Sequence, residues 1–149
     1  MAHTYTSLFV HVVFSTKDRY PFLQGDIGTQ TFSYLGGVVR NLGGRALMVG
    51  GTADHAHVLA LIPPTLATAT LANKLKSNSS GWVHGHWPSS PRFRWQIGYG
   101  GFTVGYRELP GVKDYIAKQR EHHRTVPFAE ELRALYEEHG IAFDERYLL

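Results

Sequence analysis

The chain has 149 residues, which at about 150 residues per domain predicts a single domain. With 43% apolar and 18% charged residues, its composition is that of a protein with a buried core, not of a disordered chain. The absence of cysteine excludes disulfide scaffolds, Cys-ligated zinc and thiol nucleophiles. Any metal site must therefore use nitrogen and oxygen ligands.

Charge is divided unevenly along the chain. Residues 1–91 hold six basic and three acidic side chains, residues 92–124 seven and three, and residues 125–149 two and six. A basic body with a short acidic tail suits a polyanionic partner, because Lys and Arg that neutralise phosphates release counterions. The charge alone does not establish that the partner is a nucleic acid, since many enzymes that bind none are equally basic. The N-terminus lacks a signal-peptide pattern and no apolar run approaches the roughly 18 residues that cross a bilayer, so we expect a cytoplasmic protein without a membrane partner.

Apolar periodicity and turn residues divide the chain into alternating strands and helices. In chain order we expect a strand at 4–16, a helix at 27–42, a hairpin of 45–51 and 55–62, a helix at 66–82, a loop at 83–91, a strand at 93–104, and helices at 111–123 and 128–138. The order β-α-β-β-α-β followed by two helices is that of the ferredoxin-like split unit. The expected fold is therefore α+β, with one antiparallel sheet.

His55 and His57 lie two residues apart on a predicted strand, so their imidazoles point to the same face. Two nitrogen donors on rigid backbone are the minimum for binding a divalent metal, and Asp54 is available as a ligand or as a hydrogen-bond acceptor. The alternative is a pair of half-buried histidines whose ring nitrogens bond to backbone. The residues by themselves leave both interpretations open.

Tyr115 and Gln119 are four residues apart on a predicted helix and share one face, which His122 continues. A phenol and a carboxamide would then project together. Tyr115 could equally pack half-buried beside Val112 while Gln119 is solvated. His122 and His123 stand at a helix C-terminus, where a structural or phosphate-contacting role is favoured over a catalytic one.

A rival histidine pair, His84 and His86, flanks Gly85 in the predicted loop and would be the site of an unrelated zinc enzyme. Two further groups of residues suit DNA. Lys74, Lys76 and Ser77 form a cationic, hydroxyl-rich patch able to bind phosphate, or simply a solvated helix face. The other group is Arg92, Arg94, Trp95 and Tyr99, which interleaves guanidinium and aromatic groups as surfaces that stack on unpaired bases do. Trp95 would look the same in a core.

Taken together, these segments resemble the single-tyrosine transposases of the HUH nuclease superfamily, including their REP-associated branch. The resemblance covers most of the chain and is specific in one combination, the His-x-His after a hairpin followed by Tyr-Ile-x-x-Gln at helical spacing. The segments that carry it are SLFVHVVFSTKDRYPFL, ADHAHVLALIPP, KLKSNSS, WQIGYGGFTVG, VKDYIAKQREHH and HGIAFDERYL.

The resemblance implies a ferredoxin-like or RRM-like antiparallel sheet with helices on one face plus C-terminal helices. Within one domain of residues 1–149, residues 1–109 would form the sheet core with the histidine pair, 110–124 the nucleophile helix and 125–149 an acidic helical tail. His55, His57 and Gln119 would bind a divalent metal, Mg²⁺ or Mn²⁺, and Tyr115 would be the nucleophile. Relatives are usually homodimers, although some act as monomers.

The activity implied is cleavage and rejoining of single-stranded DNA at hairpin ends through a 5′-phosphotyrosine intermediate. A phenol with a pKa near 10 is protonated at neutral pH, so it needs the help of the divalent metal to attack a phosphodiester. The alternative is a domesticated relative that binds hairpin DNA without strand transfer. Formation of a covalent adduct that depends on Tyr115 would discriminate between the two.

Overall fold

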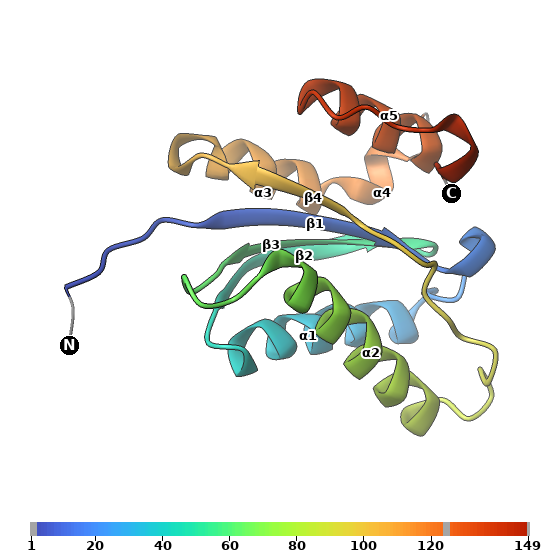
Figure 1. The fold of residues 1–149 in the computed structure, drawn as a ribbon. Coiled ribbons are helices and arrows are strands. Elements are labelled where there is room, and N and C mark those ends of the chain that lie inside the picture. The colour runs from blue at the N-terminus through green and yellow to red at the C-terminus, as the bar shows by residue number, and fades with distance from the viewer. Residues whose placement is uncertain (1–2, 124–125, 149) are drawn as a thin grey trace.

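The computed structural model describes residues 3–123 and 126–148. A four-stranded antiparallel sheet of order β2-β3-β1-β4 stands at its centre (Figure 1). The strands are β1 (Phe9–Ser15), β2 (Arg45–Thr52), β3 (His55–Leu61) and β4 (Gly100–Val104). The predicted α+β class, the antiparallel sheet and the ferredoxin-like order of elements are confirmed.

Helices cover both faces of the sheet. Figure 1 shows α1 (Asp26–Asn41) and α2 (Thr68–His86) beneath it, and α3 (Leu109–Ala117), α4 (Gln119–His122) and α5 (Phe128–Glu138) above it. Three short 3-10 helices, η1 (Lys17–Arg19), η2 (Tyr106–Glu108) and η3 (Glu145–Tyr147), complete the described elements. No helix in the part of the chain that the structure describes is long and apolar enough to cross a bilayer.

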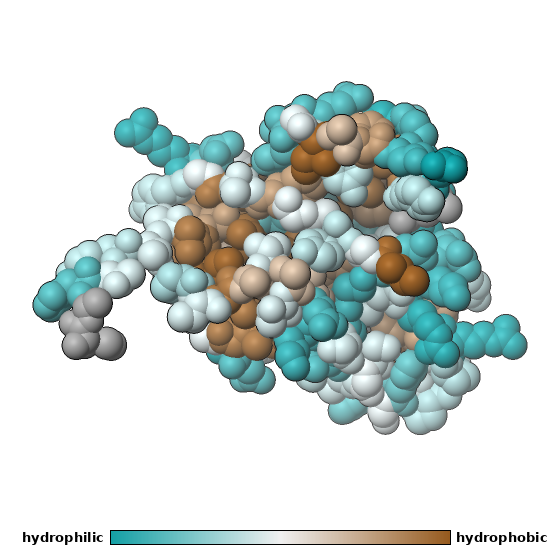
Figure 2. All heavy atoms as spheres, viewed as in Figure 1, coloured by the Kyte–Doolittle hydropathy of each residue, from teal (hydrophilic) through white to brown (hydrophobic). Residues whose placement is uncertain are grey.

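β1 is buried along its whole length because it lies inside the sheet and is covered on both faces. This explains its nearly continuous apolar sequence. Val10, Val12 and Phe14 pack into the layer of α1 and α2, whereas Val13 packs toward α5. The strand therefore contributes to two separate interiors. Figure 2 shows hydrophobic patches that are separated by hydrophilic side chains on the viewed surface.

The loop expected at residues 83–91 is partly wrong, because α2 continues to His86. Val83 is fully buried, and the Trp82 ring stacks on Tyr34 with centroids 4.7 Å apart. This packing holds the helix together through Gly81 and Gly85, although glycine is a poor helix former. Tertiary contacts therefore override the local composition.

Two other boundaries differ from the sequence prediction. The strand expected at 93–104 forms only from Gly100, because Gly98 adopts a left-handed conformation (φ +92°) that interrupts it. The helix expected at 111–123 is divided at Lys118, whose φ of −99° and ψ of 20° are not helical. The predicted 110–124 helix ends, and the 125–149 tail begins and ends, at residues outside those described.

Candidate active site

His55 and His57 of β3 lie on the sheet face that α3, α4 and α5 cover, and both side chains are fully buried. β3 is an inner strand paired with β1 and β2, so the backbone beneath the two rings is held on both sides. Nε2 of His57 lies 3.0 Å from Oε1 of Glu131, and Nε2 of His55 lies 3.5 Å from the same oxygen. The two imidazoles therefore converge on one point.

Gln119 and Glu131 bring two more groups to this point. Nε2 of His55 is 2.9 Å from Oε1 of Gln119, and the Gln119 amide donates to Oε2 of Glu131 at 3.1 Å. Gln119 is 1% and Glu131 3% exposed. Gln119 begins α4, immediately after the break at Lys118, so the division of the helix belongs to the geometry of the site.

Glu131 was not singled out from the sequence, although a signal existed. Phe128, Leu132 and Leu135 mark the buried stripe of α5, and Glu131 shares their face. A carboxylate on the buried side of an amphipathic helix requires partners. Burial alone would raise its pKa, but hydrogen bonds from His123 and His57 hold the pKa of Glu131 far below its usual value, so the group stays ionised.

The outer nitrogens of both histidines also have partners. Nδ1 of His55 lies 2.8 Å from Oδ1 of Asp54, and Nδ1 of His57 lies 2.8 Å from Nε2 of His11. Burial lowers the pKa of His57 to about 4 and that of His11 to about 3, so both rings are neutral at neutral pH. His11, on β1, was also missed by the sequence analysis, since it stands in an apolar strand.

These partners determine which atoms face the cluster. Burial would raise the pKa of Asp54, but its hydrogen bond to His55 lowers it, so Asp54 is an ionised acceptor. Nδ1–H of His55 therefore donates to Asp54, which in a neutral imidazole leaves Nε2 with a lone pair that faces the oxygen of Gln119. Two facing acceptors repel unless a proton or a cation lies between them. This donor set of imidazole nitrogens and oxygens fits a divalent cation.

Tyr115, on α3, is half-buried beside this cluster in the same chain. Its ring lies edge-on to His57 with centroids 5.7 Å apart. Burial raises its pKa well above the ordinary value, and hydrogen bonding to the Glu131 carboxylate raises it further. Tyr115 lines a cavity of about 540 Å³ together with His11, Glu131 and His122, so the phenol borders a space that a ligand can enter.

Comparison with known proteins places this geometry in a family. The model of the family described as "Transposase IS200 like" matches residues 4–119, which is most of the chain. The chain belongs to the IS200-like transposases. It is 31% identical over 126 residues to the transposases for insertion sequence element IS200 of Salmonella typhimurium and Salmonella typhi, and the match covers 81% of this chain and 82% of each relative.

Solved structures share the fold of this IS200-like chain. A transposase candidate from Deinococcus radiodurans r1 superposes with a TM-score of 0.66 at 19% identity, covering 80% of this chain and 95% of that one. A REP-associated tyrosine transposase bound to a REP hairpin superposes with a TM-score of 0.60 at 13% identity, covering 85% of this chain and 74% of that one.

His122 and His123, which lie just beyond the segment that the family model matches, also join the cluster. Nε2 of His123 lies 3.0 Å and Nε2 of His122 3.5 Å from Oε2 of Glu131. Burial would lower the pKa of His123, but its hydrogen bond to Glu131 raises it overall. Glu131 thus belongs to two groups with metal-binding geometry, one with His55 and His57 and one with His122 and His123.

The rival pair does not form a site in the transposase. His84 and His86 lie on α2, where residues two apart are separated by about 200° around the helix axis. A ring nitrogen of His84 bonds to the carbonyl of Phe93, and one of His86 to that of Trp82. His84 and His86 are therefore two helical histidines that bond to backbone carbonyls, and the rival zinc site does not form.

Except for His122 and His123, the residues predicted to bind DNA do not gather at the histidine cluster. Lys74 and Ser77 are exposed on α2, on the other side of the sheet. Nζ of Lys76 donates to the carbonyls of Gln96 and Gly98 at 2.6 and 2.8 Å and so anchors the loop before β4. This ammonium group already has two partners within the protein.

The aromatic and guanidinium group is divided in the same way. Arg92, Arg94 and Tyr99 are exposed. Trp95 is 9% exposed, its indole donates to Ser79 at 2.8 Å, and its ring packs edge-on against Phe14. The Trp95 ring therefore belongs to the core, not to a surface that stacks on bases.

Proposed function

We propose that this IS200-like transposase cleaves and rejoins single-stranded DNA at hairpin ends, using a divalent metal and a 5′-phosphotyrosine intermediate. The observation that carries the proposal is the convergence of two imidazoles, one carboxamide and one phenol. His55 and His57 come from the sheet, Gln119 and Tyr115 from helices, and all four meet around Glu131 within a single chain. The sheet supplies only the two imidazoles and the helices only the carboxamide and the phenol, so the proposed site needs both.

The metal would be held by His55, His57 and Gln119, with the Glu131 carboxylate as a further oxygen donor. The two oxygen donors suit Mg²⁺ or Mn²⁺, and the two imidazole nitrogens favour Mn²⁺ of the pair. When bound, such a cation neutralises negative charge and orients the scissile phosphate. Asp54 and His11 hold the imidazoles of His55 and His57 in place through the Nδ1 atoms of these rings.

Tyr115 would perform the covalent step. Its phenolic oxygen forms a bond to the phosphorus, the bond between phosphorus and the 3′ oxygen breaks, and the 3′ oxygen leaves with the electron pair and takes up a proton. The phenolic proton is released. The negative charge of Glu131 raises the pKa of Tyr115. Neutralisation of that charge would lower the pKa of the phenol and so promote its attack. Attack by another 3′ hydroxyl on the phosphotyrosine reverses the bonds and frees Tyr115.

Unpaired DNA is the substrate that the site accommodates. Tyr115 is half-buried at a cavity of about 540 Å³, and a recessed phenol favours a flexible, unpaired strand over a stiff duplex. The basic residues before position 125 favour a polyanion. The structural neighbour described as bound to a REP hairpin supports a hairpin next to this single strand.

Homodimerisation stays a prediction. Because Tyr115 lies beside the histidines of its own chain, one copy holds every residue of the proposed site. We therefore expect a monomer to be competent for cleavage.

Hairpin DNA with single-stranded flanks tests the proposal. The oligonucleotides should carry the sequences that flank the gene in its genome, and Mg²⁺ or Mn²⁺ should be supplied. We expect the wild-type protein to form a covalent DNA adduct on a denaturing gel. Tyr115→Phe should form none, whereas the control Tyr106→Phe, which alters an exposed phenol outside the cluster, should form it normally. The absence of an adduct with the wild type would overturn the proposed catalysis.

The alternative is a hairpin-binding protein without strand transfer, in which Tyr115 keeps its raised pKa and stays a protonated phenol when DNA and cation are bound. That alternative predicts hairpin binding that is equal in wild type and Tyr115→Phe, with no adduct in either. The same experiment thus separates the two functions.

A further inference from the structure

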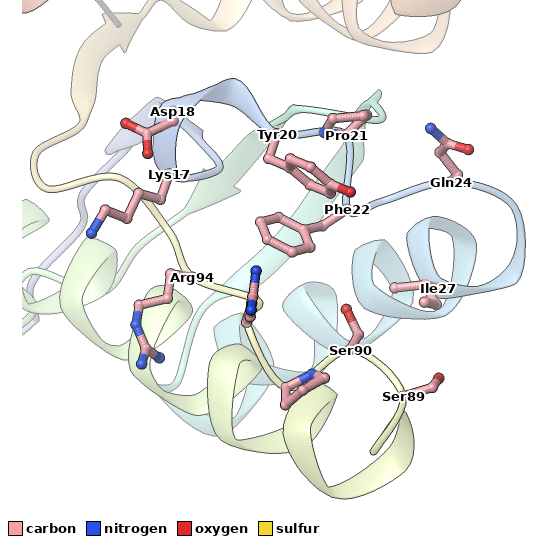
Figure 3. A pocket seen from close by; sticks show the side chains of 12 residues that line it. Lys17, Asp18, Tyr20, Pro21, Phe22, Gln24, Ile27, Ser89, Ser90 and Arg94 are labelled. Atoms are coloured by element: carbon pink, nitrogen blue, oxygen red, sulfur yellow. The ribbon is translucent and has the colours of Figure 1, made fainter.

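A second, larger cavity of about 930 Å³ lies away from the histidine cluster (Figure 3). One wall is the segment that follows β1, residues 17–24, and the other is the loop of residues 89–94. Its volume is at the upper end of the roughly 300–1,000 Å³ range of small-molecule sites. Neither the proposed metal site nor the proposed nucleophile accounts for it.

Aromatic rings form part of the first wall. The ring centroids of Tyr20 and Phe22 are 4.6 Å apart with their planes at 47°. Phe22 rests edge-on against Phe93, which is fully buried in the core. Tyr20 is 61% exposed. The pair thus presents an exposed aromatic surface that is supported from below by the buried ring of Phe93.

Cations surround these rings. Lys17, Arg92 and Arg94 are exposed and line the cavity. None of the three forms an ion pair within residues 3–123 and 126–148, and Asp18 is the single carboxylate in the described lining. Figure 3 shows Arg94 across the cavity from the rings of Tyr20 and Phe22. Aromatic faces next to unpaired guanidinium groups suit a ligand with both a flat ring and a phosphate.

The two walls are tied to the turn that leads into the catalytic histidines. The amides of Thr16 and Leu23, on either side of the first wall, donate to the carbonyls of Asp54 and Ala53, each at 2.8 Å. The amide of Lys17 donates to the carbonyl of Arg94 at 2.9 Å and joins the second wall to the first. The cavity is therefore fixed relative to the residues just before His55.

The first wall also contains an unusual backbone. Asp18 and Arg19 are consecutive non-glycine residues with positive φ, 56° and 53°. Such conformations are disfavoured and occur disproportionately at ligand sites. Hydrogen bonds from Arg19 to the Thr16 carbonyl and from Tyr20 to the Lys17 carbonyl maintain the turn that places Tyr20 at the cavity.

We propose that this cavity is a DNA subsite that binds an unpaired nucleotide of the substrate strand, with its base against Tyr20 and Phe22 and its phosphates at Arg92, Arg94 and Lys17. This inference rests on the proposed function, because it assumes single-stranded DNA as the substrate. An inorganic anion would leave the rings unused, and a purely apolar ligand would leave the cations unused. Anchored beside the turn before His55, the subsite would hold the strand that the active site cleaves.

Binding of two oligonucleotides separates the base from the phosphates. Fluorescence anisotropy would compare a labelled oligothymidylate with an abasic strand of the same length, in a chelator and in the Tyr115→Phe background, so that no cleavage occurs. We expect Tyr20→Ala to weaken binding of oligothymidylate by about tenfold, with Tyr20→Phe nearly unchanged. Neither substitution should change binding of the abasic strand, since that strand has no base to stack.

The cations are tested by salt dependence. A double variant, Arg92→Ala with Arg94→Ala, should reduce the slope of log K against log salt by about 1.4, because each phosphate contact with a single strand contributes about 0.7. The matched control is Arg40→Ala with Arg45→Ala, which removes two exposed arginines outside this cavity. Thermal unfolding checks that each variant folds. If Tyr20→Ala does not fold, the arginine variants still test the proposal.

The adduct assay with Tyr115 distinguishes failure of the subsite from failure of the proposed function. If the wild type forms the adduct while the cavity variants bind oligothymidylate as the wild type does, the subsite is refuted and strand transfer stands. If the cavity variants lose affinity but no adduct ever forms, the subsite stands and strand transfer fails. If the wild type does not bind oligothymidylate at all, the subsite is refuted, and the adduct assay with hairpin DNA alone decides strand transfer.

Discussion

The two faces of the sheet are built on different principles. Between the sheet and α1 and α2, the interior is apolar, with Leu35, Leu71 and Leu75 fully buried. Between the sheet and α3, α4 and α5, buried imidazole, amide and carboxylate groups occupy the centre. Burying such groups costs free energy that a well-packed apolar layer avoids. The comparison indicates that one face stabilises the fold and the other holds the proposed site.

Strand β3 supplies both faces through the alternation of its side chains. His55 and His57 point to the polar side, whereas Ala56 and Val58 belong to the apolar core. A shift in register by one residue would exchange the two sets. Within the described residues, Thr31 on α1 holds the single buried side-chain atom without a hydrogen-bond partner, so each buried polar atom of the polar face lies within hydrogen-bonding distance of another polar atom.

A change on the apolar face should have the largest effect on stability and none on the site. Leu75→Ala is expected to reduce the free energy of unfolding by about 2–5 kcal/mol, because it removes buried methyl groups and leaves a cavity. Urea denaturation would measure this loss. The affinity of the folded protein for Mn²⁺ should stay within a few-fold of the wild type, and a larger change would show that the two faces are not independent.

Acid should destabilise the metal-free protein through the polar face. The pKa of His11 is lowered to about 3 and that of His57 to about 4, both by burial, from about 6.5 in the unfolded chain. Below pH 6.5 the unfolded chain therefore binds protons that the folded chain does not, and stability falls as the pH is lowered toward about 3, with the contribution of His57 ending near pH 4 and that of His11 near pH 3.

Each of these two histidines should contribute a loss of about 2 kcal/mol between pH 6.5 and 5, at about 1.4 kcal/mol per pH unit. The raised pKa of His123 acts in the opposite direction and offsets part of the loss. Urea unfolding in a chelator at both pH values measures it, and His11→Leu should give a shallower dependence. Equal stability at the two pH values would contradict burial of neutral histidines.

The carboxylate of the polar face is tested by Glu131→Gln. This substitution keeps the shape of the side chain and removes its charge, so we expect Mn²⁺ affinity to fall by about 10- to 100-fold. The pKa of Tyr115 should also fall, because Glu131 raises it. Glu130→Gln, an exposed neighbour on the same helix, is the matched control and should change neither. Calorimetry and ultraviolet titration of tyrosine provide the two readouts.

His11 should have the smallest of these effects, since it acts through His57 and does not reach the cluster itself. His11→Leu removes the hydrogen-bond partner of Nδ1 of His57 and should weaken Mn²⁺ binding by about tenfold. His11→Gln, whose amide can pair with the same nitrogen, should recover most of the loss. If His11→Gln binds as weakly as His11→Leu, packing and not the hydrogen bond explains the effect.

Local patterns were sufficient to predict the sheet, its helices and the shared face of His55 and His57. These features follow from periodicity and from residues close in sequence. Glu131 lies 74 residues from His57, and no local pattern connects the two. Its position on the buried stripe of α5 was a sign that something polar must face it.

The break at Lys118 and the extension of α2 to His86 also depend on distant contacts. The first accompanies the placement of Gln119 against β3, and the second follows from Trp82 packing on Tyr34. Trp95 was predicted to stack on bases but lies in the core. Its neighbours in sequence are compatible with either position. Tertiary packing decides these cases.

The central claim is that the phenol beside the metal-binding face is the nucleophile. The most direct measurement is to digest the protein after reaction with hairpin DNA and Mn²⁺, and to locate the nucleotide by mass spectrometry. The account predicts a 5′-linked nucleotide on Tyr115, formed by the wild type and absent after chelation. A nucleotide attached to any other residue, or a cleaved strand with no covalent attachment, would contradict it.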